Sequence, residues 1–145
     1  MTAAELEKLL RTQMPLAEAM DVRVLKADAL NMELGCGLAP NHNHLGSAFG
    51  GSLSALMILA AYCRLFFLMN GKGHVLLKSS QMEFLLPVTE DLRAFVLAPQ
   101  TKDVYAFLKA YQKKGRARLV LISEVRLADG RVACRMTGEF VGRKE

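Results

Sequence analysis

The sequence predicts an α+β protein in which an antiparallel six-stranded sheet wraps around one long central helix. Three observations lead to this prediction. Residues 51–69 are apolar on every helical face and end at Asn70-Gly71, so this helix needs cover on all sides. Six other segments carry strand-like patterns. Short turns, such as the one at Asp129-Gly130, join neighbouring strands into hairpins. A curled sheet supplies the cover that the helix needs.

The chain begins with an amphipathic helix and continues into a hairpin. Thr2 can cap a helix over 3–13, which Pro15 ends because proline cannot continue a hydrogen-bonded helix. Apolar and polar residues then alternate on both sides of a short polar turn. This alternation predicts strands over 22–27 and 30–38.

The second half of the chain follows a loop rich in turn-forming residues over 41–50 and the central helix. Prolines end two of its predicted strands, and a threonine offers a cap to its helix. The predicted elements are strands over 74–86 and 92–98, a helix over 102–113 capped by Thr101, and strands over 116–127 and 131–141.

Composition and length predict one globular domain over 1–145, with 52% hydrophobic and 23% charged residues. The net charge of +5 favours acidic partners. The only tight basic cluster, 113–118, is typical of a solubilising helix end and lacks any nucleic-acid-binding motif. We therefore expect no nucleic acid and no membrane partner. Three cysteines without metal or redox spacing predict reduced thiols and a cytoplasmic location.

Chemistry is concentrated where the loop enters the central helix. Gly50 and Gly51 let a ligand approach the first helical N–H groups, which have no intrahelical partner. The helix dipole adds partial positive charge there, so this end can stabilise a carbonyl oxygen that gains negative charge. Asn43, just upstream, offers an amide that donates and accepts. The alternative is a tight turn in which the glycines serve packing and Asn43 caps the backbone.

The sequence resembles the hotdog-fold thioesterase superfamily. The resemblance rests on Asn43, Gly46 and the Phe49-Gly50-Gly51 turn that opens the central helix. It extends over nearly the whole chain, because residues 82–88 resemble the third strand of that superfamily and 116–141 its final hairpin. More narrowly, the chain is similar to the thioesterase-like domain found C-terminal to acetyltransferase domains. That subgroup is associated with decarboxylation of malonyl-acyl carrier protein.

The resemblance implies a set of site residues, with no cofactor and no metal. Asn43 and Gly51 are the implied catalytic residues, while Phe49, Gly50 and Ser80 are implied to bind substrate. Ser80 is included among the substrate-binding residues because the resemblance places the third strand beside the pocket and at a dimer interface. Open sheet edges likewise favour a homodimer or a dimer of dimers. The implied substrate is an acyl group carried by coenzyme A or by acyl carrier protein.

One departure from the superfamily pattern favours decarboxylation over hydrolysis. Related thioesterases carry an Asp or Glu two turns into the central helix, where this chain has Ile58. Without such a base, activation of water loses a factor of about 100 to 10,000. Decarboxylation needs a stabilised thioester oxygen and no activated water. Two alternatives remain: a thioesterase whose base comes from elsewhere, such as Glu83 across a dimer, and a non-catalytic acyl-binding module.

Other reactive side chains are weaker candidates. His42 and His44 have no evident third metal ligand. Ser52 and Ser54 have no nucleophile-elbow motif. Arg64, within the apolar helix, is predicted to be paired or to extend toward solvent.

Overall fold

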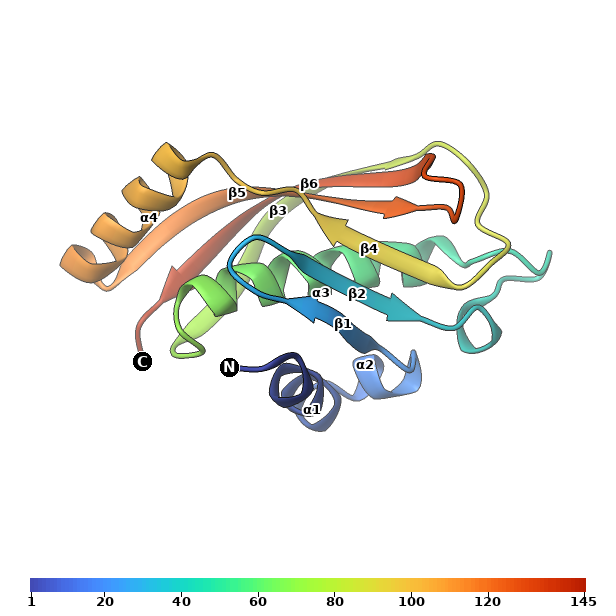
Figure 1. Cartoon of the computed structure of the whole chain (residues 1–145), viewed down its shortest axis with the longest axis horizontal. Helices are drawn as coiled ribbons and strands as arrows, with labels where there is room; N and C mark the ends of the chain where they lie inside the picture. Colours follow the sequence, from blue (N-terminus) through green and yellow to red (C-terminus); the bar gives the residue numbers. More distant parts are fainter.

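The computed structural model describes all residues from 1 to 145 and shows a curved sheet with a long helix on its concave side (Figure 1). In chain order the elements are α1 (Ala3–Gln13), α2 (Pro15–Ala19), β1 (Arg23–Ala27), β2 (Met32–Cys36), a 3-10 turn (Ala39–Asn41), α3 (Gly50–Leu68), β3 (His74–Phe84), β4 (Leu92–Val96), α4 (Thr101–Lys114), β5 (Arg116–Arg126) and β6 (Val132–Arg143).

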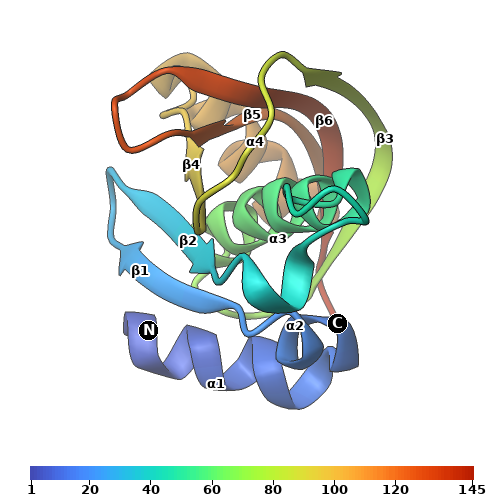
Figure 2. The same cartoon turned by 90° about the vertical axis from the view of Figure 1, so that its right-hand side faces the viewer.

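The six strands form one antiparallel sheet in the order β1-β2-β4-β5-β6-β3, which confirms the predicted α+β architecture. The central helix α3 contacts five of these strands, and Figure 2 shows the sheet curving around it. Its nine buried residues include Leu56, Met57 and Leu65, each fully enclosed. Although α3 has the length and apolarity of a membrane-crossing helix, the sheet provides its apolar environment here.

Arg64 is buried in the C-terminal part of this apolar helix. Its guanidinium donates hydrogen bonds to the carbonyls of Asp28, at 2.9 Å, and Ala29, at 2.6 Å. Burial lowers the pKa of Arg64, and the charge of Asp28 partly opposes that effect. Arg64 therefore ties α3 to the turn between β1 and β2, and its predicted pairing is with backbone rather than with a carboxylate.

Two predicted strands are shorter than expected because side chains or bent backbone take over the hydrogen bonds. The strand predicted over 30–38 begins only at Met32, since the Asp28 carboxylate accepts the N–H groups of Leu30 and Asn31. The strand predicted over 74–86 stops at Phe84. Beyond it, two consecutive N–H groups converge on the carbonyl of Ala133 and break the ladder.

The prediction that Thr101 caps the next helix is wrong. The N-cap of α4 is Gln100, and Thr101 is the first helical residue, with no side-chain cap. The other helix and strand boundaries agree with the predicted ranges to within two residues, as expected for frayed ends.

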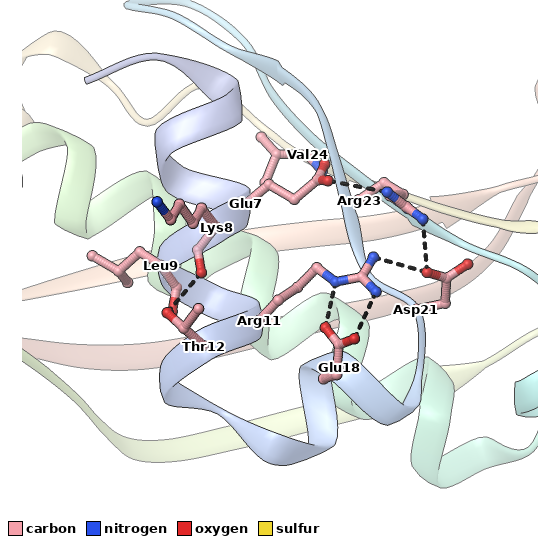
Figure 3. Close-up of polar contacts among 9 residues, drawn as sticks. All are labelled: Glu7, Lys8, Leu9, Arg11, Thr12, Glu18, Asp21, Arg23 and Val24. Carbon is pink, nitrogen blue, oxygen red and sulfur yellow. Dashed lines mark hydrogen bonds and ion pairs between the residues drawn. The ribbon is translucent and has the colours of Figure 1, made fainter.

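The N-terminal helices cover the β1 edge of the sheet (Figure 3). Glu7 of α1 accepts the backbone N–H of Val24 in β1 at 2.9 Å. Arg11 bridges Glu18 of α2 and Asp21, and these hydrogen bonds raise the pKa of Arg11. Edge strands of soluble proteins are commonly covered in this way, because free backbone groups invite pairing with other chains.

Helix α4 covers a second free edge. β4 pairs with only the last part of β5, through residues 94–96, so the first half of β5 has no strand on that side. α4 runs beside this half (Figure 1). Phe107 anchors it, since its side chain is buried against Gly142 of β6 and stacked on Tyr111.

The remaining edge, β3, is uncovered. All eleven residues of β3 are exposed or half-buried, and its outer backbone groups have no partner in this chain. Four apolar side chains at its two ends are exposed: Leu76, Leu77, Phe84 and Leu85. The chain therefore leaves one long, partly apolar strand edge free.

A charged network lies on the convex face of the sheet. Glu124 of β5 is only 4% exposed and accepts hydrogen bonds from Arg126, at 3.1 Å, and Arg135, at 2.5 Å. Burial pushes the pKa of Glu124 up, but the hydrogen bonds from the two arginines outweigh it, and the net shift is downward. Its ionised form therefore stabilises the folded state.

We expect this contribution to disappear in acid. A lowered folded-state pKa stabilises the fold above the unfolded-state value, about 4.3, and the effect is lost as pH falls through the folded-state pKa. Glu124→Gln should lower the free energy of unfolding by about 1–2 kcal/mol at neutral pH, because both arginines are partly solvated. Urea unfolding at neutral pH and near pH 3 measures this difference, which should shrink in acid. An equal difference at both pH values would contradict it. Glu139→Gln, whose nearest cations are 3.4 and 3.8 Å away, is the control with little effect.

Candidate functional site

The candidate site is built on residues 41–49, which we call the entry loop, and on the start of α3. The loop is closed by the N–H of Asn43 on the carbonyl of Ser47, at 2.7 Å, and by a bridge between His42 and Ala48. Gly46 has a φ of +79°, in the left-handed region that suits glycine. The N–H of Ala48 donates to the carbonyl of Val88, at 2.7 Å, so the loop is held against the chain that leaves β3.

The Asn43 side chain is fixed within this loop. Its Oδ1 accepts the N–H groups of Leu45, at 2.8 Å, and Ser47, at 3.2 Å. Its Nδ2 donates to the Ser47 hydroxyl at 2.9 Å. An amide nitrogen carries two hydrogens, so one donor of Asn43 is left for a ligand. The local bonds also agree with the alternative role, in which Asn43 shapes the turn.

The start of α3 presents donors without partners. Phe49 is the N-cap and makes no side-chain cap bond, and the first intrahelical bond is from the N–H of Leu53 to its carbonyl at 3.0 Å. The N–H groups of Gly50, Gly51 and Ser52 have no hydrogen-bond partner within the chain. With the dipole of a 19-residue helix behind them, these groups favour an oxygen that carries negative charge.

A hollow of about 340 Å³ lies beside this helix start. Gly50 and Phe84 both line it and face each other, since the Phe84 ring is 3.8 Å from the place of a Cβ on Gly50. The lining has no charged side chain and consists of Ala48, Gly50, Leu53, Phe84, Leu85, Leu86, Pro87 and Val88. We call this hollow the apolar pocket. Three large apolar side chains around it are more than half exposed: Phe49, Phe84 and Leu85.

Of the five predicted site residues, only Gly50 lines the apolar pocket. Asn43, Phe49, Gly50 and Gly51 belong to the entry loop and the first turn of α3. Ser80 lies apart from them, exposed on the free edge of β3 and paired with Gly138. It is four residues from Phe84, about 13 Å along the strand. Within one chain, Ser80 therefore belongs to the strand edge rather than to the entry loop.

A buried residue that the sequence argument passed over supports the loop. Asn41 is 2% exposed, and its Nδ2 donates to the carbonyls of Met20 and Gly37 at 2.9 and 2.8 Å. Its backbone carbonyl accepts the N–H of Phe49 at 2.8 Å. The sequence does not distinguish the roles of Asn41 and Asn43. The structure does, because Asn41 is buried and supports the loop, whereas Asn43 is half-buried.

The two glycines of the turn have different steric surroundings, which leads to a prediction. The Phe49 ring lies against Gly51, so a Cβ on Gly51 would collide with it, whereas Gly50 has room for one. Gly51→Ala should therefore displace Phe49 and lower kcat/KM for an acyl thioester by at least about tenfold, since small misplacements are costly in an active site. Leu45→Ala, which changes an exposed side chain of the entry loop outside the pocket lining, is the control and should stay within about threefold of the wild-type rate. Equal rates for the two variants would contradict this account of the turn.

Fold and site together define a class. A sheet wrapped around a central helix, with an apolar pocket at the helix start, is the hotdog fold of the thioesterase superfamily. Its solved neighbours agree in fold. A protein of unknown function from Chlorobaculum tepidum superposes with a TM-score of 0.89 at 21% identity, covering 99% of this chain and 94% of that one. A "putative thioesterase" from Shewanella oneidensis gives 0.86 at 21% identity, covering 97% and 96%. PaaI of E. coli gives 0.70 at 16% identity, covering 99% and 94%.

The sequence also matches a family model over residues 3–144, that of YiiD_C, described as "Putative thioesterase (yiiD_Cterm)". The chain belongs to this family. None of the curated protein sequences matches it. Membership confirms the resemblance at the level of the thioesterase superfamily and supports an enzyme that acts on acyl thioesters.

Proposed function

We propose that this chain decarboxylates the malonyl thioester of acyl carrier protein to the acetyl thioester, in fatty acid synthesis. The observation that carries the proposal is the charge-free lining of the apolar pocket, next to three unpaired N–H groups of α3. Family membership supports an acyl-thioester substrate. The residue two turns into α3 is Ile58, and no residue of α3 is acidic, so the helix offers no base for water.

The proposed reaction needs only groups that this chain can supply. The bond between the malonyl α-carbon and its carboxylate breaks, carbon dioxide leaves, and the electron pair moves into an enolate on the thioester oxygen. The free N–H of Gly51 holds that oxygen, and the free donor of Asn43 orients the carboxylate or shares the enolate charge. A proton from water then completes the acetyl group. An uncharged pocket does not repel the malonyl carboxylate. It also keeps water away from that carboxylate, which favours its departure as carbon dioxide.

Hydrolysis of the thioester is the second candidate, because the family is described as a thioesterase. It requires a base that activates water. Glu83 is the nearest acidic residue in sequence to the pocket-lining segment, but it lies on the convex side of β3, opposite Arg135. A second copy would have to bring it to the pocket. Decarboxylation needs no such group and is therefore the better fit to the residues present.

One assay separates these functions. The protein is incubated with malonyl and with saturated acyl carrier protein, and carbon dioxide and free thiol are followed separately. We expect carbon dioxide from the malonyl carrier without release of thiol. Release of thiol without carbon dioxide would establish hydrolysis instead. Tight binding with neither product would identify a non-catalytic acyl-binding module, the third possibility left by the sequence.

We also propose that two copies pair through β3. The backbone groups on its outer edge are free, and its exposed apolar residues fall in two sets near its ends: Leu76 with Leu77, and Phe84 with Leu85. These sets lie on either side of Ser80, at three to five residues from it. Antiparallel pairing centred on Ser80 places each set beside the other set of the second copy, which covers both.

The charges along β3 fit the same arrangement. Lys78 and Glu83 lie on opposite sides of Ser80, two and three residues from it, so pairing brings the lysine of one copy toward the glutamate of the other. Opposite charges across neighbouring strands are favourable. Ser80 then lies at the centre of the interface. The predicted contact between Ser80 and the substrate would have to be made there.

A further inference from the structure

The net charge of the protein is concentrated in one segment. Residues 101–118, which comprise α4 and the start of β5, contain six of the 19 basic residues and only one of the 14 acidic residues. This segment therefore carries a charge of +5, and the rest of the chain, with thirteen residues of each sign, is neutral. Among its cations only Arg118 has a carboxylate within ion-pair distance, that of Glu139 at 3.4 Å. An unbalanced patch of this kind favours an acidic partner.

Two hollows lie between α4 and the half of β5 that β4 leaves unpaired. Their volumes are about 450 and 400 Å³, and they adjoin one another, because Asp103 and Val120 line both. We call them together the β5 trough. Its lining includes four basic side chains: Lys102, Lys114, Arg116 and Arg118. Ala106 and Ala110 of α4 add small apolar surfaces, and Val120 is 55% exposed.

The strand edge along the β5 trough has backbone groups without partners. β4 pairs with β5 only as far as Ser123, and the last bond between them is donated by the N–H of Leu97 to the carbonyl of Ile122, at 2.9 Å. Alternate residues of a strand direct their backbone groups to the same side, so Val120 and Arg118 direct theirs toward this edge as well. Neither of them makes a backbone hydrogen bond there. The trough therefore contains donors and acceptors that an added strand would satisfy.

Helix α4 shields this edge without filling the trough. Phe107 holds the helix by packing against Gly142, and Met69 at the end of α3 packs on the same glycine, so this contact lies on the concave side of the sheet. Val120 alternates with the buried Leu119 and faces the convex side. The helix thus hinders pairing with a second sheet but leaves space beside β5 for one extended segment.

We propose that the β5 trough binds an extended acidic peptide segment of a partner protein, which adds to β5 as an edge strand. Free backbone groups favour a peptide, because a lipid head group or a nucleic acid lacks the regular donors and acceptors of a strand. The unbalanced cations select acidic side chains, and the alanines and Val120 accept small apolar ones at alternate positions. None of the residues that line the trough lines the apolar pocket, so this inference does not depend on the proposed function.

Fluorescence anisotropy tests the selection of charge. The probe is a labelled peptide of alternating valine and glutamate, and its counterpart carries lysine in place of glutamate. Lys114→Glu/Arg116→Glu should raise the Kd of the acidic peptide at least about tenfold at physiological ionic strength, because attraction becomes repulsion at two positions. Lys8→Glu/Lys72→Glu makes the same change of net charge at exposed positions outside the trough and should change the Kd by less than about threefold. A wild type that binds neither peptide, or both equally, would overturn the proposal.

Methylation of the peptide backbone tests the addition of a strand. Each residue of an extended peptide directs its N–H and carbonyl to one edge, so N-methyl groups on the valines block one edge and those on the glutamates block the other. Both modified peptides keep the side chains and charges of the probe. One of them should bind at least about tenfold more weakly than the unmodified peptide, since it loses several hydrogen bonds to β5. Full affinity in both would show attraction between charges alone and would overturn strand addition.

Amide hydrogen exchange locates the bound peptide on the unmodified protein, so it does not depend on the folding of any variant. The N–H groups of Arg118 and Val120 should exchange at least about tenfold more slowly when the acidic peptide is bound, because they gain partners. Leu119 and Leu121 direct their N–H groups to β6 and serve as internal controls that should change little. Equal slowing at all four residues, or none at any, would contradict an added strand.

Other anionic partners are compared by the same exchange measurement. Vesicles that contain phosphatidylserine and single-stranded RNA of mixed sequence each replace the peptide. We expect neither to slow exchange at Arg118 and Val120 selectively, because neither offers a strand edge. Slowing by vesicles or by RNA, without slowing by the acidic peptide, would identify a membrane or nucleic-acid surface instead and would overturn the proposal.

Discussion

Asn43→Ala should lower kcat for malonyl-carrier decarboxylation by about 100- to 1000-fold, the effect of removing one donor to a developing oxyanion. The reason is the single amide hydrogen of Asn43 that the entry loop leaves free. Release of carbon dioxide from malonyl-acyl carrier protein measures the effect. Wild-type turnover in this variant would remove Asn43 from the chemistry.

Asn43→Asp distinguishes donation to the substrate from support of the turn. Aspartate keeps the oxygen that accepts the N–H groups of Leu45 and Ser47, but it replaces the free donor with an acceptor. We expect this variant to fold normally and to be as inactive as Asn43→Ala. An active Asn43→Asp would mean that the side chain only shapes the loop. Asn41→Ala is the contrasting case, because it removes a buried framework residue and should lower the free energy of unfolding.

Phe107→Ala should lower the free energy of unfolding by about 3–5 kcal/mol, as expected for a large buried aromatic side chain. Phe107 is 2% exposed, packs against the backbone of Gly142, and stacks on Tyr111 with ring centres 5.7 Å apart. Its loss would leave a cavity between α4 and the sheet and loosen the helix that covers the free edge of β5.

Urea unfolding monitored by circular dichroism measures this change. Tyr105→Ala is the matched control, because Tyr105 lies on the same helix with 67% of its surface exposed. It should change the free energy of unfolding by less than about 0.5 kcal/mol. If the two variants lost similar stability, α4 would be stabilised by the intrinsic helix propensity of its residues rather than by the contact between Phe107 and Gly142. A loosened α4 should also make Phe107→Ala aggregate through the uncovered edge of β5.

The architecture could be predicted from sequence because its signals are local and periodic. An all-apolar helix over 51–69 requires cover, and alternating segments around it provide a sheet. Capping of α1 by Thr2 was likewise readable, since the capping box lies within four consecutive residues. Strand ends were less predictable. Asp28 and the carbonyl of Ala133 end strands by hydrogen bonds that no alternation pattern contains.

The site was predicted in part for the same reason. Asn43 and the Phe49-Gly50-Gly51 turn belong to one short segment, so their proximity follows from the sequence alone. Ser80 was grouped with them by resemblance, and in a single chain it lies elsewhere. Its role depends on a second copy.

By itself, then, the sequence determined the class of fold, the position of the helix start, and the absence of an acidic residue from the central helix. Those properties depend on residue type and spacing along the chain. The tertiary structure alone decided that Asn41 is buried framework, that Arg64 ties the helix to a turn, and that Arg116 faces Arg143. These are relations between residues distant in sequence, and only the register of the strands and the packing of the core bring them together.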